Sequence, residues 1–316
     1  MKVVFLGTPQ FAVPTLEALV AAGHEVTAVY TQPDRPKGRG QTLAPSPVKE
    51  AALRHGLRVC QPERIRRPES IEELKQIGAD VMVVVGYGQI IPQAIIDLPR
   101  LGIVNVHASL LPRWRGAAPI QWSIAAGDTQ TGVTTMMINA GLDTGDILLQ
   151  AATAIGAEED ALGLGERLSQ TGAELLIKTL DLLEQGACPR TPQVDADATL
   201  ARILRKEDGL VEWSRPAAEI ANRARGFLPW PGAWTWFRGQ RFNIWKCRPV
   251  PAVDAALNQP MPPGQLQASG KHLLAGTGEG VLELLEVQME GRKRVPAAAF
   301  LNGTHLAGDA ILREHP

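Results

Sequence analysis

Two polar side chains with complementary chemistry stand two residues apart in the stretch NVHASLLPRWRGAAPIQW, which begins at Asn105. Residues i and i+2 of a strand point to the same face, so the amide of Asn105 and the imidazole of His107 converge. An amide donor beside an imidazole can hold a carbonyl oxygen as it becomes an oxyanion, and the imidazole can move a proton near neutral pH. This spacing indicates chemistry on a carbonyl carbon.

A carboxylate follows in the stretch NAGLDTGDIL, where Asp143 lies in a glycine-punctuated loop between two apolar runs. It can orient His107, raise its basicity, or take a proton from an incoming nucleophile. Asp146 comes directly after Gly145 and more simply starts the next strand. The same pattern is also typical of a hydrogen-bonded structural histidine at a strand end, so the residues alone leave both interpretations open.

The elements that must position these side chains are short apolar runs separated by helical periodicity. Continuous Val and Ile runs, rather than alternation, indicate strands that are covered on both faces. We therefore expect an α/β fold with a doubly wound, mostly parallel, Rossmann-like sheet, and a site at the carboxyl ends of its strands. The expected strands are KVVFLG, EVTAVYT, VMVVVG at 81–86, GIVNVHASL at 102–110 and GVTTMMI at 132–138, and helices are expected near 47–56, 69–77, 92–98, 117–126 and 161–185.

The first turn of this fold does not favour a dinucleotide. FLGTPQF lacks the G-x-G-x-x-G pattern, and Pro9 removes a backbone donor, so NAD and FAD binding are not expected. Cysteines stand only at positions 60, 188 and 247, without zinc spacing, and no second histidine lies near His107 in the sequence. We expect no metal.

The remainder of the chain changes character. A segment at 189–207 is rich in Pro, Asp, Thr and Arg and predicts a linker between a catalytic domain at 1–188 and a second domain at 208–316. After a short helix in PAAEIANRARG, the spacing and turn residues of several short pieces predict a small, OB-like β-barrel. The pieces are AWTWF, RFNIWKC, HLLAGTG, GVLELLEVQM and AAAFLNG.

Charge is distributed unevenly along the 316 residues. Residues 1–200 hold 17 Lys and Arg against 22 Asp and Glu, whereas residues 201–316 hold 15 against 11. The basic second part suits a surface that faces a polyanion, although random scatter of surface charge explains it equally well. The apolar runs fall short of the ~18–20 residues of a membrane span, and the start is unlike a signal peptide. We expect a cytoplasmic protein without a membrane partner.

The stretch from Asn105 to Leu148 resembles the signature region of the folate-dependent formyltransferases, with its N-x-H, its SLLP and its downstream Asp. The likeness is closest to the members that act on initiator methionyl-tRNA, and it extends over nearly the whole chain. VVFLGTPQFAVPTLEAL, VYTQPDRPKGRG, ILRKEDGLVEW and RGFLPWPGAW each match in order. The resemblance implies that the α-amine of the tRNA-bound methionine directly attacks the formyl group of 10-formyltetrahydrofolate, through a tetrahedral intermediate, to produce the initiator for translation.

The resemblance also implies roles for residues at the matching positions. The catalytic residues would be Asn105, His107 and Asp143. The folate co-substrate would contact the SLLP segment and a glycine turn in VGYGQIIP that wraps the pterin, although an ordinary strand-to-helix turn explains that glycine turn equally well. The implied folate contacts are Ser109, Leu110, Leu111, Pro112, Gly86, Tyr87 and Gly88.

The initiator tRNA would be held by basic residues in both parts of the chain. The loop TQPDRPKGRGQTLAPSPVK at 31–49 matches the one that embraces the acceptor stem in the family, although its composition alone is typical of a solvated loop. We rank Arg39 first and Lys37 second in this loop, together with Arg35. The other candidate phosphate contacts are Arg202, Arg205, Lys206, Arg292, Lys293 and Arg294. We expect the protein to act as a monomer.

Two other functions remain as alternatives. The same folate chemistry can serve a small amine, such as an amino sugar nucleotide or a purine precursor, which would need neither the basic loop nor the charged barrel. A non-enzymatic RNA-binding protein could retain the fold, but Asn105, His107 and Asp143 are then unexplained.

Overall fold

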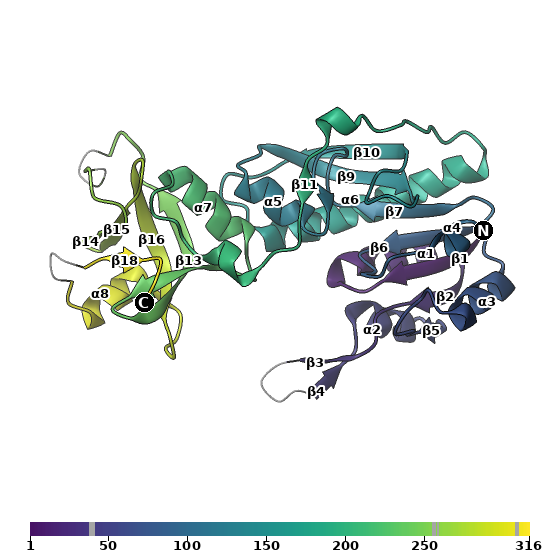
Figure 1. Ribbon diagram of the computed structural model, residues 1–316, viewed down its shortest axis with the longest axis horizontal. Coiled ribbons are helices and arrows are strands. Elements are labelled where there is room, and N and C mark those ends of the chain that lie inside the picture. The colour runs from purple at the N-terminus through teal and green to yellow at the C-terminus, as the bar shows by residue number, and fades with distance from the viewer. Residues whose placement is uncertain (38–41, 255–256, 258, 307–309) are drawn as a thin grey trace. The chain divides into compact units, whose positions relative to one another are not determined.

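The computed structural model describes residues 1–37, 42–254, 257, 259–306 and 310–316. The chain divides into two compact units (Figure 1). The first unit comprises Met1–Pro119, Gln130–Ala154 and Gly165–Ala201, and the second comprises Ile120–Thr129, Ile155–Leu164 and Arg202–Pro316. Within the described residues, no helix combines the length and the apolar character that crossing a membrane requires.

The first unit is built on a seven-stranded sheet with the strand order β10-β9-β7-β6-β1-β2-β5. The strands from β7 to β5 are parallel to one another, and β9 and β10 are antiparallel to their neighbours. This confirms the doubly wound, mostly parallel sheet. The strands are β1 (Lys2–Gly7), β2 (Glu25–Tyr30), β5 (Val59–Cys60), β6 (Val81–Val85), β7 (Ile103–His107), β9 (Gln130–Met137) and β10 (Ile147–Ala154).

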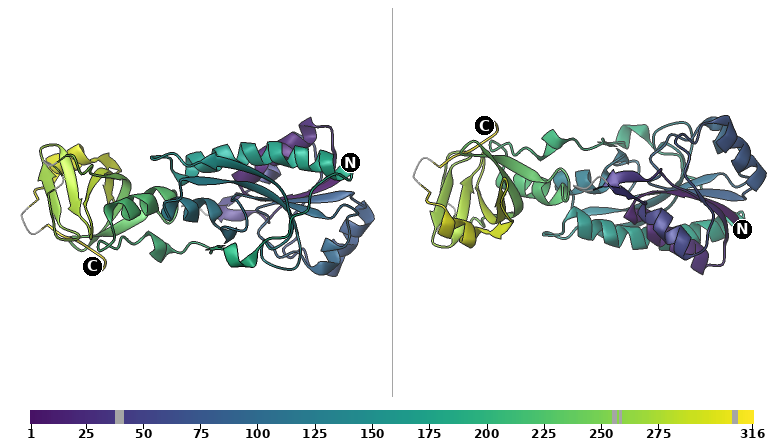
Figure 2. Two further views of the ribbon diagram at one scale, coloured as in Figure 1. Left: turned by 90° about the horizontal axis from the view of Figure 1, so that it is seen from above. Right: turned by 90° about the horizontal axis from the view of Figure 1, so that it is seen from below.

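Helices cover both faces of this sheet, with α1, α2 and α6 on one side and α3 and α4 on the other (Figure 2). Leu74 of α3 and Ile95 of α4 belong to one core cluster with Met82 of β6. Gly172 of α6 lies so close to Val106 that an added Cβ would stand 2.8 Å from that side chain. These helices are α1 (Val13–Ala21), α2 (Pro47–Arg54), α3 (Pro68–Ile77), α4 (Gln93–Ile96) and α6 (Ala161–Glu184), whereas α5 (Pro119–Ala125) belongs to the second unit from Ile120 onward.

Local sequence accounts for where several elements begin and end. The side chain of Ser46 accepts a hydrogen bond from the Lys49 amide, and Pro47 occupies the first position of α2, where a missing donor costs nothing. Gly78 ends α3 with a left-handed φ of 61°. Strand β10 begins directly after Asp146, which was expected to start the next strand, and it lies at the edge of the sheet with burial that alternates along the chain.

The second unit is an antiparallel sheet that closes on itself. The edge strands β14 and β18 are linked because the Leu312 amide donates to the Gly264 carbonyl (2.7 Å) and the Leu266 amide donates to the Ala310 carbonyl (2.8 Å). This confirms the small β-barrel. The strands are β12 (Ala233–Phe237), β13 (Gln240–Pro249), β14 (Leu266–Ser269), β15 (His272–Gly276), β16 (Val281–Met289), β17 (Val295–Pro296) and β18 (Leu312–Arg313).

The prediction of one strand of the barrel is wrong. The piece AAAFLNG forms helix α8 (Ala297–Gly303), since three alanines follow Pro296 and favour a helix over a strand. Phe300 of α8 packs edge-on against Phe242 and Phe237, with ring centroids 5.4 and 6.2 Å apart, so the helix fills the barrel core. The helix expected in PAAEIANRARG is present as α7 (Ala217–Gly226).

Short elements organise the segments that were expected to be irregular. In the basic loop, β3 (Arg35–Lys37) pairs antiparallel with β4 (Thr42–Ala44). In the expected linker, β11 (Leu200–Ala201) pairs in parallel with β8 (Arg115–Gly116), and the boundary between the two units falls directly after Ala201. The described part of the chain also holds three short 3-10 helices, η1 (Gln10–Ala12), η2 (Asp195–Asp197) and η3 (Lys206–Gly209).

Candidate active site

Asn105 and His107 lie near the carboxyl end of β7, between β6 and β9. Their spacing places both side chains on one face of the strand. The Asn105 amide is half-buried and forms no side-chain hydrogen bond with any described residue, so its donors remain open to a ligand. His107 is only 6% exposed.

The hydrogen bonds of His107 define its proton positions. Its Nε2 lies 2.9 Å from the carbonyl oxygen of Trp114. A carbonyl only accepts, so Nε2 carries a proton and the ring presents Nδ1 to its other neighbour. That neighbour is Asp143, whose Oδ2 lies 3.7 Å from Nδ1. The structure therefore brings His107 and Asp143 together, and the separation leaves room to tighten when a substrate binds.

The loop that carries Asp143 is shaped by its own polar residues. Asn139 Oδ1 accepts hydrogen bonds from the Gly141 amide (3.0 Å) and the Thr144 hydroxyl (2.9 Å). Gly145 passes so close to β9 that a Cβ would stand 1.8 Å from the Met137 carbonyl, which excludes any larger residue. Asp143 itself has a left-handed φ of 49°. Its Oδ2 accepts a hydrogen bond from the Gly116 amide at 2.8 Å, which directs the carboxylate toward His107.

The SLLP segment is held in shape by β9 and β10. The buried Thr134 donates to the Ser109 carbonyl (2.7 Å) and accepts from the Leu111 amide (3.1 Å), and Gln150 Nε2 donates to the Leu111 carbonyl (2.9 Å). The Ser109 hydroxyl is also buried and donates to the Arg113 carbonyl at 2.6 Å. Leu111 is buried and joined to Pro112 by a cis peptide bond, and Leu110 is half-buried.

The glycine turn after β6 is also braced from outside. Gly86 and Gly88 both have positive φ angles, of 57° and 82°. The carbonyl of Tyr87 accepts hydrogen bonds from the Thr8 hydroxyl (3.0 Å) and from Gln32 Nε2 (3.1 Å). The Tyr87 ring is buried in the core, and burial raises the pKa of its phenol. The turn thus presents backbone, not the Tyr87 ring, to its surroundings.

Sequence reasoning missed the residues that hold these loops together. Trp114 supplies a carbonyl to His107, Gly116 supplies an amide to Asp143, and Gln193 donates to the Asp143 carbonyl from the segment expected to be a linker. The sequence gave a hint for two of the residues that brace the site. Thr134 is a polar residue within a buried strand, and Gln193 follows Thr and Pro in an otherwise loop-like TPQ. Among the described residues, no group of three or more His, Cys, Asp or Glu could hold a metal ion.

The expected tRNA contacts fall at several places. Arg35 is exposed on β3, Lys37 is the last residue of that strand, and Arg39 lies outside the described residues. Lys49, at the end of the same loop, forms an ion pair with Asp34 (2.6 Å). Arg292 and Lys293 are exposed in the turn between β16 and β17.

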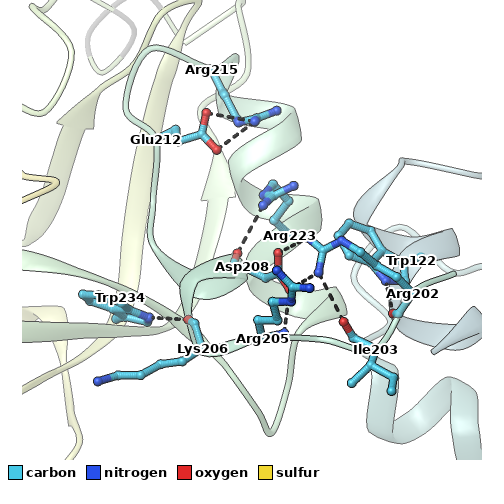
Figure 3. A network of polar contacts seen from close by, with 10 residues as sticks. All are labelled: Trp122, Arg202, Ile203, Arg205, Lys206, Asp208, Glu212, Arg215, Arg223 and Trp234. Atoms are coloured by element: carbon cyan, nitrogen blue, oxygen red, sulfur yellow. Dashed lines mark hydrogen bonds and ion pairs between the residues drawn. The ribbon is translucent and has the colours of Figure 1, made fainter. Parts of the chain in front are cut away.

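Arg205 and Lys206 lie at η3, in a polar network of the second unit (Figure 3). Asp208 is at its centre and accepts hydrogen bonds from the Arg202 guanidinium and from the Arg205 amide (2.7 Å). Burial alone would raise the pKa of Asp208, but these donors hold the pKa below its ordinary value. The Lys206 ammonium lies 5.8 Å from the ring centre of Trp234, and the Arg202 guanidinium lies 4.8 Å from that of Trp122, so each cation is positioned by an aromatic ring.

Comparison with known proteins assigns the chain to a family. Residues 1–180 match the family described as formyl transferase, and residues 203–305 match its C-terminal domain. The chain belongs to the formyl transferase family. It is 62% identical over 314 residues to the methionyl-tRNA formyltransferase of Solibacter usitatus, covering 99% of both chains, and 56% identical over 305 residues to that of Koribacter versatilis, covering 96% of both.

Solved structures share the fold at low sequence identity. An N-formyltransferase from Helicobacter canadensis, in complex with folinic acid and dTDP-3-aminofucose, superimposes with a TM-score of 0.67 at 18% identity and covers 92% of this chain and 99% of its own. HypX from Aquifex aeolicus, in complex with tetrahydrofolic acid, has a TM-score of 0.63 at 16% identity and covers 95% of this chain and 47% of its own. The fold is therefore that of folate-binding formyltransferases.

Proposed function

We propose that the protein transfers the formyl group of 10-formyltetrahydrofolate to the α-amine of methionine esterified to initiator tRNA. The observation that carries this proposal is the open Asn105 amide beside a buried His107 whose Nδ1 faces Asp143 at 3.7 Å. Full-length identity of 62% to a methionyl-tRNA formyltransferase supports the choice of acceptor.

Each polar group would have a distinct part in the reaction. The neutral amine attacks the formyl carbon, a C–N bond forms, and the carbonyl oxygen becomes an oxyanion. The Asn105 amide donates to that oxygen, and His107 in its protonated form would add a donor at Nδ1, the nitrogen that its Nε2 bond to the Trp114 carbonyl leaves free. Asp143 orients the ring through Nδ1 and receives the proton that the amine releases, directly or through water. Collapse of the intermediate breaks the bond from the formyl carbon to N10 of tetrahydrofolate, and N10 leaves as a neutral amine because Asp143 passes the proton to it, directly or through water.

The folate would bind between the SLLP segment and the turn at Gly86–Gly88. Leu110, Leu111 and Pro112 would supply apolar contact, and the backbone of the turn would pair with the donor and acceptor edge of the pterin. Ser109 would contribute its backbone, because its hydroxyl is already bonded to the Arg113 carbonyl. The tRNA phosphates would contact the exposed basic residues Arg35, Arg205, Lys206, Arg292 and Lys293, together with Lys37 and Arg39.

Incubation with labelled formyl donor tests the function. We expect formyl transfer to charged initiator tRNA, little transfer to charged elongator tRNA, and none to an amino sugar nucleotide. Transfer to the amino sugar nucleotide without transfer to methionyl-tRNA would overturn the assignment. Failure to bind folate in calorimetry would instead point to an RNA-binding protein without catalytic activity.

Two further properties belong to the same proposal. We expect the protein to work as a monomer in the cytoplasm, where both of its substrates occur. Sedimentation equilibrium at micromolar concentration should give the mass of one chain, and a dimer mass would contradict this.

A further inference from the structure

Gln193 uses its whole side-chain amide around the loop that carries Asp143. Its Nε2 donates to the carbonyl oxygens of Asp143 (2.8 Å) and Gly145 (2.7 Å), and its Oε1 accepts from Nε of Arg115 (3.0 Å). The orientation of this amide is unambiguous because an arginine Nε only donates and a carbonyl only accepts. Gln193 therefore bridges the Asp143 loop and strand β8.

The other end of this bridge leads back to the same carboxylate. Arg115 is buried, and its guanidinium forms an ion pair with Asp195 (2.9 Å), two residues beyond Gln193. The residue that follows it, Gly116, donates its amide to the Asp143 carboxylate. Gln193 thus holds the backbone of Asp143, and Gly116, which follows Arg115 in the chain, holds its side chain.

The same segment also holds the partner of His107. The hydroxyl of Thr199 accepts a hydrogen bond from the Trp114 amide (2.9 Å), and its carbonyl accepts one from the Arg115 amide (2.8 Å). The carbonyl of Trp114 in turn accepts from His107. The segment 193–201 consequently fixes both the carbonyl that holds the His107 proton and the loop that aims the Asp143 carboxylate.

This bracing matters because Asp143 occupies a left-handed conformation that a non-glycine residue rarely adopts, with φ at 49°. Such a conformation persists only where surrounding bonds hold it. Released from Gln193, the loop can relax and carry the carboxylate away from His107. Displacement of a catalytic group by about 1 Å can cost on the order of 10²-fold in rate.

We propose that Gln193 is a positioning residue for formyl transfer, which holds the Asp143 loop so that its carboxylate faces Nδ1 of His107. The segment 193–201 is thereby part of the active site of the first unit and not a passive connection. This inference rests on the proposed function, because it presumes that Asp143 and His107 serve the reaction.

The first test compares a series of Gln193 variants by steady-state kinetics. Gln193→Glu keeps the acceptor for Arg115 but removes both donors, Gln193→Met removes every hydrogen bond without adding charge, and Gln193→Asn keeps the amide but shortens its reach. We expect kcat to fall about 10- to 100-fold in the first two and less in the third, with the KM values for folate and tRNA within about twofold of the parent. Gln185→Glu, an exposed position of the same unit, is the matched control and should retain the parental kcat.

The second test asks whether Gln193 acts through Asp143. In an Asp143→Asn background, assayed by single turnover with excess enzyme, adding Gln193→Met should lower the rate by less than about twofold, because residues that work through one another are not additive. If Gln193 had a purely structural role, Gln193→Met would lower the thermal stability, and it would reduce the rate as much in the Asp143→Asn background as in the parent.

The outcomes distinguish the positioning role of Gln193 from the proposed function of the protein. An unchanged kcat in the series, or a full loss in the Asp143→Asn background, would overturn the role of Gln193. Should Gln193→Glu fail to fold in circular dichroism, the uncharged Met and Asn variants still carry the test. Failure of the proposed function is seen separately, as absence of formyl transfer by the parent protein.

Discussion

Two aspartates, one in each unit, illustrate how different surroundings give the same carboxylate different roles. Asp208 of the second unit accepts from the Arg202 guanidinium and the Arg205 amide, and its pKa is held below the ordinary value. Among the residues that the structure describes, the Asp143 carboxylate of the first unit accepts a hydrogen bond only from the Gly116 amide, and it faces His107 at 3.7 Å. The Asp208 carboxylate accepts three hydrogen bonds, whereas the Asp143 carboxylate retains more of its acceptor capacity.

The number of hydrogen bonds that each carboxylate accepts distinguishes a structural role from a chemical one. A carboxylate that accepts three hydrogen bonds stabilises the groups around it and has little acceptor capacity left for a substrate. A carboxylate that is held by one donor and by its own backbone can still accept a proton. The same contrast holds between the Asn105 amide, which no described residue engages, and the Gln193 amide, which is fully engaged.

The largest expected effect, on kcat, is at Asn105 and His107 of the first unit. Replacing Asn105 or His107 with Ala should lower kcat by about 10²–10³-fold, because each change removes a donor from the developing oxyanion. Single-turnover formylation of initiator methionyl-tRNA measures it, with Asn302→Ala at an exposed position of α8 as the control. Near-parental turnover in either variant would exclude that residue from the mechanism.

An intermediate effect, on stability, is expected at Asp208. Asp208→Asn should lower the free energy of unfolding by about 1–2 kcal/mol at pH 7, a modest value because half of the Arg202 side chain is exposed. The kcat at saturating tRNA should not change. Urea denaturation of parent and variant measures the difference.

The pH dependence of that difference has a definite sign. The pKa of Asp208 is lower in the folded protein than its ordinary value. Its stabilising contribution is therefore fully present above about pH 4 and is lost as the pH falls through the folded pKa. Parent and variant should converge in stability on acidification below pH 4, and a constant difference down to that range would contradict the ion pair as its source.

The smallest expected effect is at the exposed cation beside Trp234. Lys206→Ala should raise the KM for tRNA by about two- to fivefold and lower the slope of log KM against log salt by roughly 0.7–0.9, the value of one phosphate contact. The folate KM should stay constant. Lys271→Ala, in an exposed turn of the barrel, is the control, and equal changes in both variants would indicate only general electrostatic attraction.

Local patterns were sufficient for much of the fold. Continuous apolar runs predicted the central strands β1, β2, β6 and β7 because burial on both faces leaves a distinct composition. The misassigned piece AAAFLNG shows the limit of this reasoning, since its apolar residues suit either a strand or a helix, and the packing of Phe300 into the barrel decided for the helix.

The amino-acid order alone placed Asn105 and His107 on one face of a strand, because the strand period of two is a property of the local backbone. It also placed Asp143 in a glycine-punctuated loop. Only the tertiary structure brought Gln193 to the Asp143 carbonyl, 50 residues away, and Thr199 to Trp114, 85 residues away. No local rule sets such distant contacts, because they depend on how the whole chain closes around the sheet and on which carbonyls are left without a donor.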